Sequence, residues 1–459
     1  MAAPTNSRFR FYAILSLMVL TCLILISQVI SFPTATSLLP STLQRPFPGT
    51  DADSHQQQGG DEEAAGGGKH GGDKQPGPNK PPSFRNYTSA HSFDADAAAF
   101  PDWMARLPDS ASLASLSIPG THDTLTHRLA DQGYQCQNLA LGAQLRAGVR
   151  YLDLRLRLGA AGDLLVYHAA AYTGYAYADV LLAAFAFLDA HPREGLVLRV
   201  KEEGPPVDDH GDGDARPGPL EPGTVAAAGS DVVNSTRTFE EAFNYYRLED
   251  PRTAPGCAKH LLLPAARSDR AAAEQGSETE MPIPTLGELR GRALVLQEFD
   301  SAAPYGIPWL SGQLALEDYW VVANASFLDD KWDAIRENLE LAAAASPSRA
   351  GDGAQQEPPR RLYLSHLSAS VGVLPIEAAA GPLDHPSIAG MNDRTGRWLA
   401  APGHNATAGI VIADFPGRAL VEAILSHNEW LVDRPQPQPQ PQPRRRARRP
   451  RAVPVGARL

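Results

Sequence analysis

Cysteine is scarce in this chain. Only three cysteines occur among the 459 residues, and Cys22 lies inside an apolar segment near the N-terminus. Cys136 and Cys257 remain, so at most one disulfide forms between them in an oxidising compartment. Two buried thiols are the open alternative, and the sequence does not decide between the two.

Two further features are missing. No glycine-rich nucleotide fingerprint follows the first apolar run of the folded region, which argues against a dinucleotide site. Acids are absent from residues 434–459, which hold Pro-Gln repeats and eight arginines, although the whole chain has a net charge of -11. An acidic body with a basic tail is not the charge distribution of a nucleic-acid-binding domain, so we expect no nucleic acid partner. We expect a disordered tail, either a solvated end or a segment attracted to anionic lipid headgroups.

Charge is also missing from residues 11–32, which form an uninterrupted apolar segment. This segment is long enough to span a bilayer as a helix. Arg8 and Arg10 precede it, so the positive-inside rule predicts a cytoplasmic N-terminus at residues 1–10 and a membrane-anchored body that is lumenal or extracellular. A cleaved signal peptide, which would give a secreted protein, is the alternative. We favour the anchor because no clear small-x-small cleavage site follows.

Composition divides the rest of the chain. Residues 33–93 are rich in glycine, proline and glutamine and are expected to form a disordered linker. Residues 94–433 are expected to form the folded domain, whose oligomeric state is left open. Four glycosylation sequons fit a secretory route and predict a glycoprotein, at Asn86, Asn234, Asn324 and Asn405.

Eight short apolar runs in the folded domain predict strands. Helix-like stretches at 178–189 and 331–341 alternate with them, so the predicted sheet is parallel. Eight such strands predict an α/β fold of the TIM type, a (β/α)₈ barrel distorted by insertions, with an open doubly wound sheet as the alternative. The runs are Leu113–Ile118, Val149–Leu156, Leu164–Tyr167, Leu196–Val200, Ala293–Phe299, Tyr319–Ala323, Leu362–Ser365 and Gly409–Ala413.

Ionisable residues gather at the predicted strand ends. In a barrel these ends meet at one rim, where the catalytic groups of such enzymes lie. Asp153 and Arg155 share one face of their strand because side chains alternate along it. A polar ring of this size is costly without a charged ligand to complete it. The set is His122, Asp123, Asp153, Arg155, His168, Lys201, Glu203, Glu298, Asp318, His366 and Asp414, of which His366 has no assigned role.

Two histidines and an arginine suit in-line displacement at a phosphodiester. A neutral imidazole takes a proton from the attacking hydroxyl and a protonated one gives a proton to the leaving oxygen, each contributing roughly 10²–10⁴-fold to the rate. Arginine holds the non-bridging oxygens bidentately and keeps its charge. A carboxylate behind the base fixes its tautomer.

Three motifs in order carry a specific resemblance. Residues 117–123 (Ser-Ile-Pro-Gly-Thr-His-Asp), residues 150–155 (Arg-Tyr-Leu-Asp-Leu-Arg) and Tyr167-His168 resemble the X region of phosphatidylinositol-specific phospholipase C, bacterial and fungal single-domain type. The resemblance covers roughly residues 98–432. It implies cleavage of a membrane inositol phospholipid, either phosphatidylinositol or a glycosylated form, to diacylglycerol and inositol 1,2-cyclic phosphate.

The resemblance also implies a role for each site residue. His122 would be the general base, oriented by Asp414, and His168 the general acid, supported by Asp123. Arg155 would clamp the phosphate. Contacts with the headgroup would come from Asp153, Lys201, Glu203, Asp318 and Trp320, with Trp320 as an aromatic platform under the ring.

The same comparison bears on metal use. Calcium-dependent animal members of this family have an asparagine after the first histidine and acids on strands two and four. This chain has Asp123, Arg155 and Lys201 at those places. Two cations where calcium ligands would stand predict a metal-independent enzyme without a cofactor.

Two departures and two alternatives accompany the resemblance. Glu298 stands where the bacterial type has a basic inositol contact, and Ala169 follows His168 in place of the usual glycine, which puts the native headgroup in question.

The alternatives are a metal-dependent glycerophosphodiesterase-like barrel and a catalytically silent barrel that binds inositol lipid or glycan at the cell surface. Arg155 disfavours the first, and the presence of both histidines disfavours the second.

Overall fold

The computed structural model describes residue 84 and residues 86–207, 237–264, 281–346, 361–404 and 406–432. Contacts divide the chain into two units, residues 1–75 and 76–459, and all described residues belong to the second. The expected anchor, nearly all of the linker, the basic tail, Asn234 and Asn405 lie outside the described residues. Within the described ranges, no helix has both the length and the apolar character needed to cross a bilayer.

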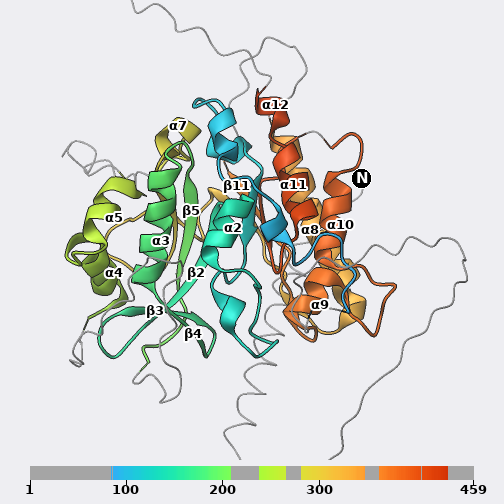
Figure 1. The fold of residues 1–459 in the computed structure, drawn as a ribbon, viewed down its shortest axis with the longest axis horizontal. Coiled ribbons are helices and arrows are strands. Elements are labelled where there is room, and N and C mark those ends of the chain that lie inside the picture. Colours follow the sequence, from blue (N-terminus) through green and yellow to red (C-terminus); the bar gives the residue numbers. More distant parts are fainter. Residues whose placement is uncertain are drawn as a thin grey trace, which may run out of the picture. The chain divides into compact units, whose positions relative to one another are not determined.

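A curled parallel sheet forms the centre of the second unit (Figure 1). Its strands follow the order β6-β7-β5-β2-β1-β13-β11-β9, and β8 also pairs with β7. The bounds are β1 Ile118–Thr121, β2 Tyr151–Leu158, β5 Leu196–Glu202, β6 Leu261–Leu262, β7 Ala293–Glu298, β8 Ile307–Pro308, β9 Leu314–Glu317, β11 Leu362–His366 and β13 Ile410–Ala413.

The α/β class and the curled parallel sheet of the prediction are confirmed, but the described strands form a half-barrel. No pairing among them joins β9 to the β7 edge. Only the two-residue strands β6 and β8 lie along that edge, and Pro308 in β8 has no N–H with which to extend the ladder.

Three predicted strands differ from the structure. The run at 164–167 belongs to β3 (Leu164–His168), which pairs antiparallel with β2 and with β4 (Ala171–Ala176), because a short apolar run does not reveal strand direction. The run at 319–323 is replaced by β9 and by β10 (Val321–Val322), which pairs with β12 (Ser370–Val371) in a separate sheet. The first run is mostly a 3₁₀ turn, Leu113–Ser115, and β1 begins only at Ile118.

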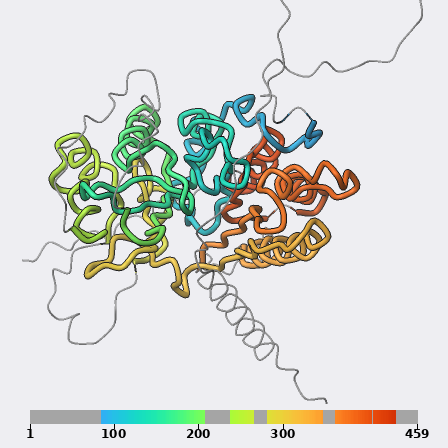
Figure 2. The backbone as a smooth tube through the Cα atoms, turned by 90° about the horizontal axis from the view of Figure 1, so that it is seen from below, coloured from blue at the N-terminus to red at the C-terminus, as the bar shows by residue number. Residues whose placement is uncertain are grey.

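Helices cover the outside of the sheet, as the view from below shows (Figure 2). The two helix-like stretches noted in the sequence are confirmed as α3 (Tyr177–Ala190) and α8 (Leu328–Ala345). The others are α2 Leu141–Ala147, α4 Phe239–Leu248, α5 Ala254–His260, α7 Leu286–Leu289, α9 Pro375–Ala380, α10 Met391–Leu399, α11 Arg418–Ser426 and α12 Glu429–Val432. Further 3₁₀ turns are Ala95–Ala97, Trp103–Arg106, Thr126–Arg128 and Ala325–Phe327.

The interior of the half-barrel is apolar at one end and polar at the other. Ile118, Tyr151, Val197, Leu364 and Ile410 belong to one buried cluster, which Trp103 and Trp430 close at the amino ends of the strands. Two outer clusters lie between the strands and the helices. Successive inward side chains become ionisable towards the carboxyl ends, so the polar site rests on a packed core.

Close approach of β1 to β2 positions the site. A Cβ on Gly120 would lie 2.9 Å from Cδ1 of Tyr151, nearer than carbon atoms pack. The absence of a side chain therefore allows β1 to pair with β2 and carry His122 to the strand end.

Candidate active site

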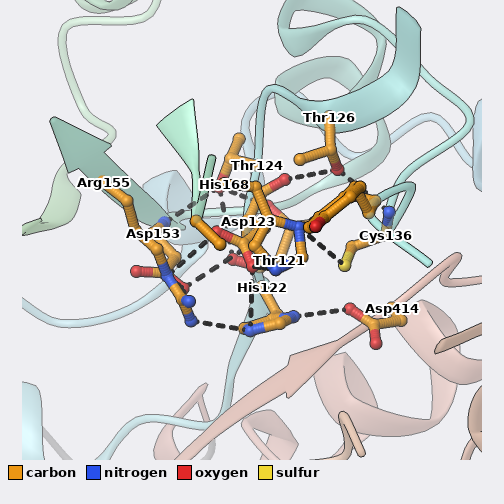
Figure 3. A network of polar contacts seen from close by, with 12 residues as sticks. Thr121, His122, Asp123, Thr124, Thr126, Cys136, Asp153, Arg155, His168 and Asp414 are labelled. Carbon is orange, nitrogen blue, oxygen red and sulfur yellow. Dashed lines mark hydrogen bonds and ion pairs between the residues drawn. The ribbon is translucent and has the colours of Figure 1, made fainter. Parts of the chain in front are cut away.

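Strand register brings His122 and Asp414 together. Thr121 on β1 pairs with Ala413 on β13, so the next residue of each strand lies beside the other. Nδ1 of His122 is 2.8 Å from Oδ1 of Asp414 (Figure 3). The Gln137 amide donates to the backbone carbonyls of His122 and Ala413, which holds both strand ends in place.

The other ring nitrogen of His122 faces Arg155. Nη2 of Arg155 is 2.7 Å from Nε2 of His122, and a guanidinium can only donate. The contacts with Arg155 and Asp414 favour the tautomer that a general base requires, with Nε2 bare and the hydrogen on Nδ1. The Asp123 carboxylate, 3.1 Å from Nε2, stabilises the ring once it is protonated.

Asp123 lies between the two histidines. Its Oδ2 is 3.1 Å from Nε2 of His122 and 3.2 Å from Nε2 of His168, while its Oδ1 is 2.9 Å from Nε of Arg155. The backbone of Asp123 has φ 42°, a left-handed conformation that non-glycine residues seldom adopt. Asp153 accepts from the Asp123 N–H, which holds this turn. Strain of this kind persists where surrounding contacts fix it and is typical of functional sites.

His168 reaches the site from the β3–β4 hairpin. Its Nδ1 is 2.8 Å from the carbonyl oxygen of Tyr134, so Nδ1 carries a hydrogen. Its ring centre is 6.2 Å from that of His122. Ala169, in the place where a glycine was expected, has φ 50°, and its N–H donates to Glu203. The strained alanine is thus held by a hydrogen bond from the rim.

Burial and charge set the protonation of the site. Burial, with the charge of Arg155, holds the pKa of His122 well below its ordinary value. Burial and the Asp123 carboxylate raise the pKa of Asp414. The lowered pKa of His122 favours the neutral imidazole.

Asp153 is buried beside these groups. Its Oδ2 is 3.2 Å from Nη2 of Arg155, and its Oδ1 is 3.4 Å from Nη1 of Arg199. Burial alone would raise the pKa of Asp153, but the two guanidinium groups hold it well below its usual value. In the structure this carboxylate positions Arg155.

The predicted headgroup residues lie along the rim. Lys201 pairs with Glu203 at 2.6 Å. Glu203 also lies 3.8 Å from Nη1 of Arg155, which links this pair to the centre. Asp318 and Trp320 follow β9 in an exposed segment, and the structure brings neither into direct contact with the two histidines. Glu298 pairs at 2.7 Å with Arg199 of the neighbouring strand.

Metal-ligating side chains of the described part of the chain gather only at this site. Three overlapping groups have suitable spacing: His122, Cys136 and Asp414; Asp123, Cys136 and His168; and His122, Asp123 and Asp153. Arg155 contacts three members of these groups directly. A guanidinium at that point supplies positive charge where a cation would otherwise bind. Metal independence remains a prediction.

Four residues at the site were not predicted to belong to it. Arg199 alternates with Lys201 on β5, so the rule that grouped Asp153 with Arg155 would have found it. Cys136 lies 3.9 Å from Nδ1 of His168, and no local pattern marks it. Trp309 and Gln137 reach the site from loops. Of the two alternatives for cysteine, the structure has buried free thiols at Cys136 and Cys257.

Known proteins resemble this chain in sequence. No family model matches the chain. The 1-phosphatidylinositol phosphodiesterase of Listeria monocytogenes is 26% identical over 352 residues, covering 72% of this chain and 85% of that protein. That of Staphylococcus aureus is 28% identical over 170 residues, or 36% of this chain and 46% of that protein. Human PI-PLC X domain-containing protein 1 is 32% identical over 131 residues, or 21% of this chain and 40% of that protein.

A solved structure agrees at the level of the fold. A variant of the phosphatidylinositol-specific phospholipase C from Staphylococcus aureus superposes with a TM-score of 0.50 at 20% identity. The match covers 72% of this chain and 98% of that one. The chain is similar in sequence and in fold to bacterial phosphatidylinositol-specific phospholipases C, the family that its three motifs resemble.

Proposed function

We propose that this enzyme cleaves phosphatidylinositol, or a glycosylated inositol lipid, to diacylglycerol and inositol 1,2-cyclic phosphate. One observation carries the proposal: two imidazoles flank Asp123 with their Nε2 atoms 3.1 Å and 3.2 Å from the same carboxylate oxygen, beside Arg155. The Listeria relative, a 1-phosphatidylinositol phosphodiesterase, aligns with this chain over 85% of its length. Both observations fit acid–base catalysis at a phosphodiester.

His122 acts as the base. Its bare Nε2 takes the proton of the inositol 2-hydroxyl, whose oxygen then forms the new bond to phosphorus. The imidazolium that results keeps its Nδ1 hydrogen on Asp414, 2.8 Å away, and Asp123 stabilises its positive charge. A positioned base of this kind contributes roughly 10²–10⁴-fold to the rate.

His168 acts as the acid. Its Nδ1 hydrogen is held by the Tyr134 carbonyl, and Asp123 lies 3.2 Å from Nε2. An acceptor oxygen therefore faces each ring nitrogen of His168. The Nε2 proton passes to the glycerol oxygen as the bond between that oxygen and phosphorus breaks. Diacylglycerol leaves as a neutral alcohol.

Arg155 holds the phosphate. In the free enzyme its guanidinium contacts His122, Asp123 and Asp153. A bound phosphodiester offers it non-bridging oxygens, and moving onto them frees Nε2 of His122 for the substrate hydroxyl. The transition state concentrates negative charge on those oxygens, so a preorganised guanidinium favours it over the ground state. Lys201, Glu203, Asp318 and Trp320 are proposed to contact the headgroup from the rim.

The test uses the full-length chain with phosphatidylinositol in mixed micelles and excess chelator. We expect diacylglycerol and a cyclic phosphodiester, which phosphorus NMR distinguishes from an acyclic monoester. His122→Ala and His168→Ala are each expected to abolish turnover while the circular dichroism spectrum stays unchanged. Full activity in either variant removes that residue from the scheme. Binding of inositol lipid without turnover would favour the silent barrel instead, and a metal-dependent acyclic product would favour the glycerophosphodiesterase-like enzyme.

We also propose that the catalytic unit is lumenal or extracellular. The charge pattern around residues 11–32 supports this orientation, as do the sequons at Asn86 and Asn324, whose side chains are exposed. Endoglycosidase treatment of protein from a secretory host should increase its mobility on a gel. An unchanged mobility, together with digestion of the catalytic unit by protease added to the cytoplasmic side of intact vesicles, would contradict the proposed location.

A further inference from the structure

Further polar side chains lie beside and beneath the catalytic groups. Asp153 pairs in register with Arg199, and His366 pairs with Ile412, two residues before Asp414. Directly paired residues of parallel strands point to the same face. Thr121 pairs with Leu152, so Asp153 and Arg199 lie level with His122, whereas His366 enters the half-barrel one layer below His122 and Asp414. Asp153 and Arg199 are partners of each other, with 3.4 Å between their side chains, so His366 is the residue of this group whose role is not accounted for.

The hydrogen bonds of His366 define its tautomer. Its Nδ1 is 2.9 Å from the backbone carbonyl oxygen of Glu317, and a carbonyl only accepts. Nδ1 therefore carries the hydrogen, and Nε2 presents a lone pair. His366 is fully buried, and no described residue donates a hydrogen bond to Nε2. An unfilled acceptor in the interior is costly, and native proteins seldom leave one without a purpose.

The surroundings of His366 suit a neutral polyhydroxylated ring. The ring centre of Trp309 lies 6.0 Å from that of His366, in an edge-on arrangement. The guanidinium of Arg199, on β5, lies 3.9 Å from the centre of the Trp309 ring. Glu298 neutralises Arg199 at 2.7 Å. The register of β9 and β11 places Asp318, which is exposed, beside His366.

We propose that His366 is a substrate-binding residue whose Nε2 accepts a hydrogen bond from one ring hydroxyl of the inositol headgroup, over a floor formed by Trp309 and Arg199. The inference rests on the proposed function and adds a specificity contact to it. A hydroxyl fits because it brings a donor without charge. A phosphate dianion offers only acceptors and would face Asp318 and Glu298, and an ammonium group would meet Arg199.

Two substitutions separate the acceptor from a structural role. His366→Asn keeps an N–H near the position of Nδ1 for the Glu317 carbonyl and removes Nε2. His366→Gln can place an oxygen acceptor near the position of Nε2. We expect the asparagine variant to raise KM for phosphatidylinositol and the inhibition constant of free myo-inositol about 3- to 10-fold with little change in kcat, and the glutamine variant to recover part of this loss.

Mono-deoxy inositols identify the hydroxyl. One mono-deoxy inositol should inhibit the wild type more weakly than myo-inositol does. The same two compounds should inhibit His366→Asn equally, because that variant already lacks the contact with the missing hydroxyl. His260→Asn is the matched control. His260 is also buried, and its Nδ1 also faces a carbonyl, that of Gly291, but it packs on Phe185 outside the half-barrel. This control should leave both constants unchanged.

The outcomes keep the two proposals apart. If the wild type neither cleaves the lipid nor binds myo-inositol, the proposed function fails and the subsite with it. If the wild type cleaves and binds while His366→Asn keeps the wild-type constants, the subsite is refuted and the function stands. Equal losses in the asparagine and glutamine variants, with the same discrimination among deoxy inositols as the wild type, would show a purely structural histidine and would also refute it.

Discussion

Nη2 of Arg155 lies 2.7 Å from Nε2 of His122, so the phosphate clamp of the proposed mechanism rests on the proposed base. The contact has two consequences. It keeps the base deprotonated and in one tautomer, and it places the guanidinium where the attacking hydroxyl has to arrive. Substrate binding therefore exchanges one partner of Arg155 for another, and the same side chain couples phosphate recognition to exposure of the base.

Arg155→Met should lower kcat about 10²–10³-fold, since it removes a preorganised donor to the transition state. It should also change the pH profile. Arg155 lowers the pKa of His122, so its loss raises that pKa, and the acid limb of kcat/KM moves to higher pH. Rate profiles measured from acid to neutral pH check the direction of the shift.

Arg155→Lys is the control for this prediction. It keeps a positive charge but loses the planar fork, so kcat should fall while the acid limb stays closer to that of the wild type. An acid limb that moves to lower pH in the methionine variant would contradict the assignment of His122 as the base.

Asp414→Asn should reduce kcat by about 10²–10⁴-fold. The asparagine amide can donate to Nδ1 of His122, which would place the ring hydrogen on Nε2 and remove the lone pair that the base requires. Nitrogen NMR of labelled histidine reports the tautomer beside the kinetic measurement. Activity near that of the wild type, with the tautomer unchanged, would show that Asp414 has no orienting role.

The grouping of several residues at one proposed site could be predicted because parallel register is regular. His122, Asp153, Arg155, Lys201 and Asp414 all lie on the barrel strands or directly after them, at positions that alternation and strand-end rules identify. The neighbours on adjacent strands then follow from pairing. These residues needed no knowledge of loops to be grouped correctly.

The remainder depends on contacts between distant segments. The run before His168 looked like a barrel strand, and only its antiparallel pairing with β2 reveals a hairpin. Trp309 enters the interior from a loop after β8. The open edge of the half-barrel follows from the two-residue strands β6 and β8, which are too short to appear as apolar runs in the sequence. Short elements carry little periodicity, so their pairing is decided by packing and is not visible in the sequence.

Turnover should be insensitive to metal removal. The candidate ligand groups of the described residues all lie around Arg155, whose fixed charge takes the place of a cation. We expect the same kcat in excess EDTA and after adding back calcium or magnesium. Loss of activity in EDTA that calcium restores would overturn this prediction and would favour a metal-binding arrangement of His122, Asp123 and Asp153.

The motif at 150–155 has a stabilising residue at one end and a proposed catalytic residue at the other. Arg150 is fully buried, donates to Glu194 at 2.9 Å, and also donates to the carbonyls of Leu145, Val149 and Pro101. Arg150→Met leaves Glu194 buried without its partner, so the free energy of unfolding should fall by about 3–5 kcal/mol. Urea denaturation measures this loss, and kcat per folded molecule should not change because Arg150 precedes the amino end of β2 and does not reach the groups around Arg155.

A second substitution and a surface variant complete this test. Adding Glu194→Leu to Arg150→Met removes the stranded charge and should recover part of the lost stability, since a buried pair costs more to break than to replace. Arg418→Ala removes an exposed pair with Glu422 and should leave the unfolding curve unchanged. If Arg150→Met kept full stability but lost activity, Arg150 would belong to the catalytic machinery and the division of the motif into two ends would be wrong.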